Sequence, residues 1–384
     1  MPTNALNATA HTDEKPCSAQ SFVNTLSKLS IHQGSENIGI RNVDTQVQLV
    51  QIGNQLVPAT LNSAEYQNSY VCSPYTAYIS YAKDELGLLN NPLLESLLSG
   101  GIILAGLALK LAKLNQTLSL NNWLVSTNLL PSWTAQDIQE ATQRLTQQRP
   151  QHSLSIRSLN LKHHSTLIEL LKSQGWLLLP ARQVYLFDNH DRQWWQRNHT
   201  KKDQALLRKV EAGKLPLHWL KPHELLDSDF KSLEICFNQL FIEKHSPYNP
   251  QFSAEFLREM HHQGLIEFHS FRDENGRIIA TIGLFTQQNT ITTPIVGYDT
   301  DLPKELGLYR LLMAVLLRLT YERQQPMNLS SGAGSFKRAR GGEPVLEYTA
   351  FYTQHLPWGR RFIHQGFAKL LNKFAPKMFE KHQI

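Results

Sequence analysis

The order of hydrophobic patterns along this chain repeats itself, and that repeat constrains the fold more than any other feature. Each half contains short apolar runs typical of strands, helices with apolar residues every three or four positions, and further strands. A basic segment, residues 196–214, separates the two halves. At 384 residues the chain also exceeds the length at which a single hydrophobic core usually stops growing. The sequence therefore predicts an α+β protein built from two similar domains.

Four segments follow from this pattern. Residues 1–44 are rich in Asn, Ser, Thr and Gln without sustained periodicity, and we expect them to form a flexible leader. Residues 45–195 are expected to form the N-terminal domain, 196–214 a basic connector helix, and 215–384 the C-terminal domain with a C-terminal helix. Each domain is predicted to be a mixed, mostly antiparallel sheet flanked by helices.

The first half alternates strand and helix patterns. Residues 121–130 and 153–160 are predicted to be strands, and residues 176–187 a pair of strands. A helix is expected over 134–150, with Thr134 as its N-terminal cap.

The second half has the more informative order of elements. Residues 265–286 are typical of a hairpin with Asn275 and Gly276 at its turn, and residues 289–299 continue the meander. A long apolar helix follows over 303–324, then a short strand, a loop of small residues and a last strand. This succession of meander, helix, strand, loop and strand is the arrangement of the GNAT acyltransferase superfamily.

The chain resembles the tandem-GNAT branch related to the FemAB-like aminoacyl transferases, over roughly residues 45–384. In such proteins the strand after the long helix ends in a glycine, followed by an aromatic residue and a lysine. Gly332, Phe336 and Lys337 match that spacing, and Asn328 stands where relatives often have an acidic residue.

The segment before the long helix resembles the part of the superfamily that faces the acyl donor. The nearest register to the acetyl-CoA pattern gives Lys304, Gly307 and Tyr309. Tyr309 is bulky where a small residue lets backbone amides approach a pyrophosphate. The donor is therefore open between acyl-CoA, an acyl carrier protein and aminoacyl-tRNA, with Gly307 and Tyr309 predicted to line its site.

The resemblance implies direct acyl transfer, in which an amine attacks a thioester or ester carbonyl. Such an enzyme positions two substrates and stabilises an oxyanion, and it supplies no nucleophile of its own. The sequence agrees, because it lacks a GxSxG elbow, an HExxH motif and a Walker loop.

The loop after the short strand is the first candidate site. Its small residues allow a close backbone approach, and cationic side chains follow them. We predict that Lys337 takes part in catalysis and that Ser331, Gly332, Phe336 and Arg338 bind the donor. The alternative is a glycine turn with a solvated basic flank.

A second candidate lies where a helix ends at a proline-bounded loop. His245 is predicted to act as the general base, with Glu243 as its competitor. Lys244, Tyr248 and Asn249 are predicted to bind substrate. The alternative is a capped surface loop.

Tyr298 and Asp299 end a strand that would border the cleft. Tyr298 is a predicted binding residue, and Asp299 is predicted to hold a cationic amine or to cap the turn before Pro303. Glu347 and Tyr348 on the last strand either face the site or alternate in the sheet.

Metal and disulfide chemistry are not indicated. The histidines around His261 and His269 lie on different faces or elements, and the three cysteines are far apart in the sequence. We predict no metal and no tightly bound cofactor. The N-terminus has no apolar core behind a basic start, so the expected location is the cytoplasm.

Three further segments bear on partners. The connector cations Lys201, Lys202, Arg208 and Lys209 either meet tRNA or form a solvated face, in a chain of net charge +6. The apolar run 97–109 is too short for a membrane span and is predicted to be a buried helix, with an acyl-chain pocket or a docked interface as the alternative. The C-terminal segment is amphipathic and basic, with Phe367, Leu370, Leu371 and Phe374 in one stripe, and it is expected to pack on its own domain or on a membrane.

The resemblance implies an N-acyltransferase with acyl-CoA or an acyl carrier protein as co-substrate. Its acceptor is expected to be an amine on a small molecule or a cell-envelope precursor. An aminoacyl-tRNA-dependent transferase is the alternative enzyme, and an inactive GNAT-fold binding module is the alternative from another class. No DNA partner and no transmembrane segment are predicted.

Overall fold

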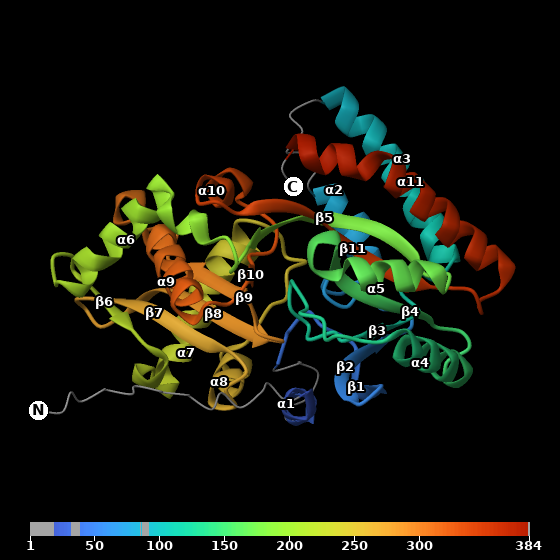
Figure 1. Cartoon of the computed structure of the whole chain (residues 1–384), viewed down its shortest axis with the longest axis horizontal. Helices are drawn as coiled ribbons and strands as arrows, with labels where there is room; N and C mark the ends of the chain where they lie inside the picture. Colours follow the sequence, from blue (N-terminus) through green and yellow to red (C-terminus); the bar gives the residue numbers. More distant parts are fainter. Residues whose placement is uncertain (1–18, 32–38, 85, 87–91, 383–384) are drawn as a thin grey trace, which may run out of the picture.

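One mixed sheet runs through the whole molecule (Figure 1). The computed structural model describes residues 19–31, 39–84, 86 and 92–382, and in this part of the chain the sheet has eleven strands in the order β1-β2-β3-β4-β11-β5-β10-β9-β8-β7-β6. The strands are β1 (Gln46–Ile52), β2 (Gln55–Asn62), β3 (Thr117–Leu120), β4 (Ser153–Asn160), β5 (Leu177–Phe187), β6 (Leu217–Leu220), β7 (Glu267–Asp273), β8 (Ile278–Gln287), β9 (Thr290–Tyr298), β10 (Met327–Asn328) and β11 (Glu343–Tyr352). Neighbouring strands are antiparallel except for the pairs β3/β4 and β9/β10. The predicted α+β class, with a mixed and mostly antiparallel sheet, is confirmed.

Helices cover the sheet and extend beyond one edge of it (Figure 1). The α-helices are α1 (Ala19–Ile31), α2 (Tyr81–Asp84), α3 (Pro92–Leu111), α4 (Ala135–Gln148), α5 (Leu161–Ser173), α6 (Asn198–Glu211), α7 (Phe230–Phe237), α8 (Ala254–His262), α9 (Leu308–Arg323), α10 (Gly334–Ala339) and α11 (Trp358–His382). Helix α4 begins as predicted, because the Thr134 side chain and Asp137 form a reciprocal capping box.

The two halves share an internal repeat. In the first half, parallel strands β3 and β4 are joined by α4, and then α5 leads to the long strand β5. In the second half, parallel strands β9 and β10 are joined by α9, and then α10 leads to the long strand β11. The repeat predicted from the hydrophobic patterns is therefore present in the connectivity.

The last strand of each half crosses into the other half. Strand β5 pairs with β11 and β10, both of which come from the second half. Strand β11 pairs with β4 and β5, both of which come from the first half. The sheet has no break between the halves, so the division into residues 45–195 and 215–384 stays a prediction.

Part of the predicted flexible leader is a packed helix, which corrects that prediction. Helix α1 buries Phe22, whose ring centroid lies 5.2 Å from that of Trp123. Ile40 is fully buried and forms a bridge with Phe252 in the second half. The polar composition of this region concealed a small apolar stripe on α1. Residues 1–18, which include Cys17, and residues 32–38 lie outside the described part of the chain.

The basic connector contains a helix, as predicted, and this helix is tied to the second half. Asp203 of α6 is buried and forms ion pairs with Arg310 on α9 at 2.7 Å and with Arg340 after α10 at 2.6 Å. Gln204 donates to the carbonyl of Ala314 on α9 at 2.7 Å. One face of α6 is therefore fixed, and its cations lie on the other face.

Helix α3 is only half-buried, which corrects the prediction of a buried helix over 97–109. One face packs through Leu109 and Ile102 against α11 and the sheet, while Leu104 and Leu107 are exposed to solvent. The sequence could not reveal this, because both faces of the helix are apolar. No helix in the described residues is long and apolar enough to cross a membrane.

Candidate functional site

The loop after β10 encloses its own lysine. Ser330, Gly332 and Ala333 have positive φ angles of 56°, 80° and 49°, so the backbone folds back on itself before α10. Lys337 of α10 is buried, and its Nζ donates to the carbonyls of Leu329 and Ser331, both at 2.7 Å. Burial, and after it the charge of Arg182, lowers the pKa of Lys337 to about 7. Lys337 thus holds the loop in shape, and its predicted catalytic contact stays a prediction.

The other predicted residues of this loop have separate surroundings. Gly332 is exposed, and a Cβ atom built on it would meet nothing within 4 Å. The guanidinium of Arg338 donates to the Tyr185 hydroxyl at 3.3 Å and lies over the same ring. Residues 334–339 form a helix, where the sequence indicated a loop throughout.

An aromatic group fills the space beside the start of α9. The Tyr309 ring lies 4.8 Å from Phe336 and 6.3 Å from Tyr298, centroid to centroid. Burial raises the pKa of Tyr309 to about 12. Gly307 precedes the helix with a φ of 66°. The predicted donor residues Tyr298, Tyr309 and Phe336 are therefore brought together, and their rings pack against the hydrophobic core of the second half.

The corresponding position in the first half carries a carboxylate. Helix α4 occupies the place of α9 in the repeat, and the carboxylate of Asp137 caps its N-terminus by accepting from the Thr134 backbone and hydroxyl, both at 2.8 Å. The turn at Gly53 lies directly against Asp137. A negatively charged cap disfavours an anionic ligand at this helix start.

The second predicted cluster lies at a contact between the two halves. The carbonyl of Tyr248 accepts from the Tyr70 amide at 3.1 Å and the Ser69 hydroxyl at 2.9 Å. The side-chain amide of Asn249 donates to the carbonyls of Phe241 and Ser246. These partners explain why Asn249 is buried, and substrate binding by Tyr248 and Asn249 stays a prediction.

The charged members of that cluster are on the surface. Glu243, Lys244 and His245 are exposed, and the His245 ring packs beside Phe241 at 5.7 Å. Partial burial and the neighbouring Lys244 lower the pKa of His245. The described structure gives His245 no acidic partner that would orient it, and its role as the base stays a prediction.

Within the protein, Asp299 caps the turn before Pro303, which is one of its two predicted roles. It accepts from the Asp301 amide at 3.1 Å and forms an ion pair with Arg277 at 2.9 Å. Its carboxylate therefore already has a cationic partner, and a contact with a substrate amine stays a prediction.

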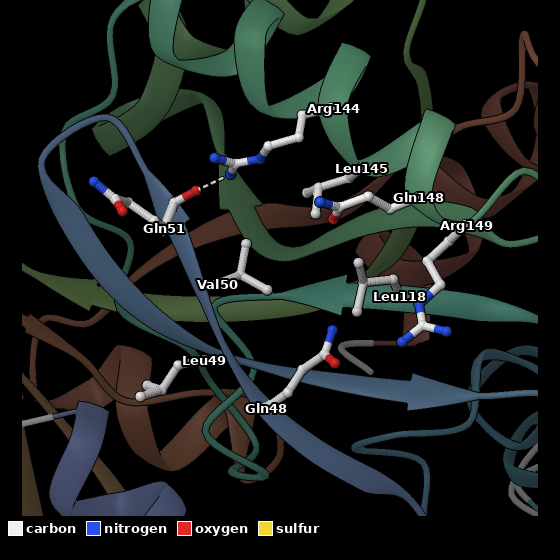
Figure 2. A pocket seen from close by; sticks show the side chains of 9 residues that line it. All are labelled: Gln48, Leu49, Val50, Gln51, Leu118, Arg144, Leu145, Gln148 and Arg149. Carbon is white, nitrogen blue, oxygen red and sulfur yellow. Dashed lines mark hydrogen bonds between the residues drawn. The ribbon is translucent and has the colours of Figure 1, made fainter.

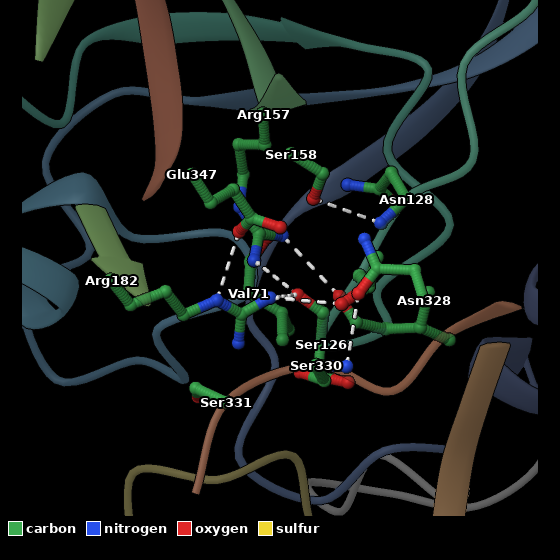
Figure 3. A network of polar contacts seen from close by, with 12 residues as sticks. Val71, Ser126, Asn128, Arg157, Ser158, Arg182, Asn328, Ser330, Ser331 and Glu347 are labelled. Atoms are coloured by element: carbon green, nitrogen blue, oxygen red, sulfur yellow. Dashed lines mark hydrogen bonds and ion pairs between the residues drawn. The ribbon is translucent and has the colours of Figure 1, made fainter. Parts of the chain in front are cut away.

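A different set of residues converges where the last strands of the two halves cross (Figure 3). Arg182 on β5 forms an ion pair with Glu347 on β11, with Nε 2.9 Å from Oε1. A second Arg182 nitrogen, Nη2, donates to the Ser126 carbonyl at 2.5 Å and to the Thr127 hydroxyl at 3.0 Å. Burial opposes the charge on Arg182, but Glu347 and Tyr70 outweigh it, so the pKa of Arg182 is raised.

Arg157 on β4 joins the same network. Its Nη1 donates to the Val71 carbonyl at 2.8 Å, and its Nη2 donates to the Ser126 carbonyl at 3.3 Å. Burial lowers the pKa of Arg157, and Arg182 contributes to this shift. Residues 121–130, predicted to be a strand, instead form an irregular loop whose carbonyls bind both arginines.

Several polar atoms in this region have no partner in the described structure. Glu347 Oε2 is buried and accepts no hydrogen bond, although the other oxygen binds Arg182. Asn160 Nδ2, on the residue paired with Glu347 across the sheet, and Arg338 Nη2 are also buried without partners. Buried polar groups are normally satisfied, and a bound water or ligand would satisfy these atoms.

The backbone near the network is strained. The described chain has nine non-glycine residues with positive φ. Five of them lie in the loops and strands that form or adjoin the network: Asn121, Leu124, Ser158, Ser330 and Ala333. Such conformations cost roughly 1 to 3 kcal/mol each and cluster at functional sites. Arg182 and Arg157 both lie near one carboxylate, Glu347, so the network contains more cationic than acidic groups.

Arg157 and Arg182 were missed by sequence reasoning. Each is the one charged residue within an otherwise apolar or small strand pattern, residues 153–160 and 176–187. A lone arginine inside a buried strand must be paired, and that signal was available. Glu347 was named, but its partner on another strand could not be identified from sequence.

The two cavities described in the structure lie apart from this network. One, of about 500 Å³, lies between β1 and α4 and is lined by Gln48, Gln51, Arg144 and Arg149 among others (Figure 2). The other, of about 490 Å³, lies between α5 and α11. Neither is lined by Arg157, Arg182 or Glu347. Within the described residues, no group of three or more His, Cys, Asp or Glu could hold a metal ion.

Comparison with known proteins gives a likeness of fold. The chain matches no protein-family model and no curated protein sequence. It is similar to the C-terminal domain (DUF2156) of a putative lysylphosphatidylglycerol synthetase from Agrobacterium fabrum, with a TM-score of 0.50, 10% identity, and coverage of 87% of this chain and 92% of that one.

Two other solved structures are less similar. L-PGS from Bacillus licheniformis has a TM-score of 0.43 and 14% identity, over 61% of this chain and 78% of its own. FemX has a TM-score of 0.44 and 6% identity, over 56% of this chain and 75% of its own. These two likenesses are too weak to carry an argument. The likeness to the Agrobacterium domain is one of fold, and the internal repeat confirms the predicted tandem arrangement of two α+β repeats.

Proposed function

We propose that this protein is an acyltransferase whose reaction centre is the network of Arg157, Arg182 and Glu347. The observation that carries the proposal is the unpartnered Oε2 of Glu347, buried among cationic side chains where the two repeats exchange strands. A carboxylate held by Arg182 through one oxygen can accept a proton through the other. The surrounding positive charge then stabilises negative charge on the carbonyl oxygen under attack.

The proposed reaction is direct transfer. The acceptor amine attacks the donor carbonyl and loses a proton to Glu347, a carbon–nitrogen bond forms, and the carbon–oxygen bond to the donor breaks. The leaving hydroxyl takes up the proton. Arg182 fixes Glu347 in position through the ion pair, and Lys337 holds the adjacent loop at the edge of the site.

We propose aminoacyl-tRNA as the donor, in place of the acyl-CoA expected from the sequence. Both helix starts at which the repeats would meet a pyrophosphate carry side chains that disfavour one, Tyr309 and Phe336 at α9 and Asp137 at α4. Residues 192–221 contain eight cationic and two acidic residues, an excess equal to the +6 of the whole chain. Lys201, Lys202, Arg208 and Lys209 are exposed on α6, as phosphate contacts require. The Agrobacterium relative, named for lysyl transfer to a lipid, is consistent with an aminoacyl group.

The test is a comparison of donors. Purified protein is incubated with mixed charged tRNA, acyl-CoAs and acyl carrier proteins, each with a panel of amine acceptors, and loss of donor is measured against a protein-free control. We expect accelerated loss of aminoacyl-tRNA only. Consumption of acyl-CoA or acyl carrier protein alone would overturn the donor assignment. Binding of tRNA without turnover across the acceptor panel would indicate a binding module.

A further inference from the structure

Exposed apolar side chains are concentrated on two helices. The described chain has thirteen exposed large hydrophobic residues, and nine of them lie on α3 or α11: Ile103, Leu104, Leu107, Leu111, Trp358, Phe362, Leu370, Phe374 and Met378. Leu104 and Leu111 are 70% and 78% exposed, and Trp358 is 77% exposed. A surface helix normally presents polar residues to water, so this surface, called here the α3–α11 surface, requires an explanation.

The two helices lie side by side at the outer edge of the molecule (Figure 1). Their inner faces pack together through Ile102, Ile363 and Phe367. Arg360 at the start of α11 donates to the carbonyls of Ala112 at 2.9 Å and Lys113 at 3.3 Å, just beyond the end of α3. The α3–α11 surface is therefore built on a fixed pair of helices.

Apolar and cationic residues run along α11 in parallel rows. The exposed apolar residues 358, 362, 370, 374 and 378 recur at intervals of four or eight, so they follow one ridge of the helix. Arg361, Lys369 and Lys373 follow the neighbouring ridge at the same spacing, and both lysines are exposed. An apolar row beside a basic row is the pattern of a helix that lies in a membrane interface.

Positive charge predominates on α11 and at the end of α3, and the single acidic residue of each helix, Glu95 in α3 and Glu380 in α11, lies near a helix end. No Asp or Glu occurs in residues 96–136 or in residues 348–379, although the chain contains 32 acidic residues. Lys110 and Lys113 add positive charge at the end of α3, and both are exposed. The occupant of this surface must therefore combine apolar and anionic chemistry.

These observations point to one occupant. We propose that the α3–α11 surface docks the protein on an anionic lipid bilayer. The apolar side chains would enter the boundary between headgroups and acyl chains, while the lysines contact lipid phosphates. A second copy of the chain fits less well, because pairing two such surfaces would bring like charges together. The proposal stands independently of the donor and the reaction.

The experiment is vesicle sedimentation with the full chain. Vesicles of phosphatidylglycerol mixed with phosphatidylcholine are compared with vesicles of phosphatidylcholine alone, at low and high salt. We expect binding to the anionic vesicles that is weakened by salt and by omission of phosphatidylglycerol. The double variant Leu104→Ser, Leu107→Ser should lower the partition coefficient at least about tenfold, because both side chains lose apolar burial in the bilayer.

Matched controls distinguish binding through the α3–α11 surface from nonspecific adsorption to vesicles. Leu226, 61% exposed, lies on neither α3 nor α11, and Leu226→Ser should leave binding unchanged. Lys369→Glu with Lys373→Glu should weaken binding roughly tenfold, whereas Lys28→Glu with Lys304→Glu should not. Thermal unfolding of each variant verifies that it is folded.

The proposal is overturned by any of three results. The protein fails to sediment with either kind of vesicle, or Leu226→Ser loses as much binding as the α3 variant. In the third, sedimentation velocity shows a dimer that the α3 variant dissociates, which would assign the surface to a second copy. If the wild-type protein binds the vesicles but consumes no donor, that result contradicts the proposed function and leaves the membrane proposal intact.

Discussion

Glu347 has two oxygens with different surroundings, and that asymmetry defines the proposed chemistry. One oxygen accepts from Arg182 at 2.9 Å, whereas the other is buried without a partner. A purely structural ion pair gains most when all its polar atoms are satisfied. An unsatisfied oxygen beside strained loops is therefore better explained by a ligand or a transferred proton.

Glu347→Gln tests this at the level of one atom. The amide keeps the shape and one oxygen for Arg182 but cannot accept a proton as a base, so we expect the transfer rate to fall roughly 10²- to 10⁴-fold. Glu343→Gln is the matched control, because Glu343 lies on the same strand but its side chain is 55% exposed. Single-turnover rates measure both. Equal rates for Glu347→Gln and the wild type would remove Glu347 from the mechanism.

Lys337 gives a prediction about pH. Its pKa is lowered from the ordinary value of 10.5 to about 7, so between these values the unfolded chain holds a proton that the folded protein has released. The free energy of unfolding should then rise with pH by up to about 1.4 kcal/mol per unit, and the cost of the buried charge is fully present below pH 7. Lys337→Met should lack this rise. Urea unfolding of both proteins between pH 7 and 10 measures the difference, and parallel curves would contradict it.

At the scale of elements, the groups at the helix ends determine which elements contact one another. The cation at the start of α11 satisfies carbonyls at the end of α3, where a helix leaves acceptors without partners. The helix starts of the two repeats carry different groups, a carboxylate in α4 and aromatic rings at α9. The same connectivity thus offers different ligand surfaces in the two halves.

Arg360→Ala should destabilise the protein by about 1.5 to 3 kcal/mol, because charged hydrogen bonds to several partly buried acceptors are lost. Arg361 is the matched control: it makes one exposed hydrogen bond, at 3.3 Å to the Gln354 carbonyl. Arg361→Ala should change stability by no more than about 0.5 kcal/mol. Chemical denaturation measures the free energy of unfolding of both variants, provided that the dependence on denaturant concentration is the same in each. Equal effects of the two substitutions would exclude the proposed role of Arg360.

The exposed cations of α6 should govern affinity for tRNA. Lys201→Glu with Lys202→Glu should weaken tRNA binding and lower the slope of log affinity against log salt by about 2, one for each lost phosphate contact. Lys28→Glu on α1 is the control for net charge. Filter binding over a salt series measures the slope. An unchanged slope in the α6 variant would place tRNA binding elsewhere or exclude it.

The whole molecule is joined by the exchange of strands β5 and β11. Each of these strands pairs only with strands of the other half, and Trp123 packs against Phe285 across the same boundary. Opening the boundary would leave two long strands without hydrogen-bond partners. The reaction centre lies on these strands, so the halves and the site depend on one another.

We therefore expect a single unfolding transition. The unfolding curve measured by tryptophan fluorescence, which reports on Trp133 and Trp176 in the first half and on Trp219 in the second, should coincide with the curve measured by circular dichroism in one urea transition. A fragment of residues 1–195 should be insoluble or unfolded, since β5 would lack both neighbours. Two separate transitions, or a folded fragment, would support the predicted independent domains.

The sequence by itself determined the α+β class and the internal repeat. These depend on the spacing of apolar residues, which local geometry converts directly into helices and strands. It also located the cap at Thr134 and the spacing of Gly332, Phe336 and Lys337, because such features lie within a few residues of one another.

Only the tertiary structure decided which residues meet. Arg157, Arg182 and Glu347 come from strands far apart in sequence, and they converge because the last strands cross between halves. The α1 helix and the exposed face of α3 were likewise decided by what packs against them, since an apolar residue carries no mark of its neighbour. Charges inside apolar strands required partners, but long-range pairing, which has no local signature, determined which partners they found.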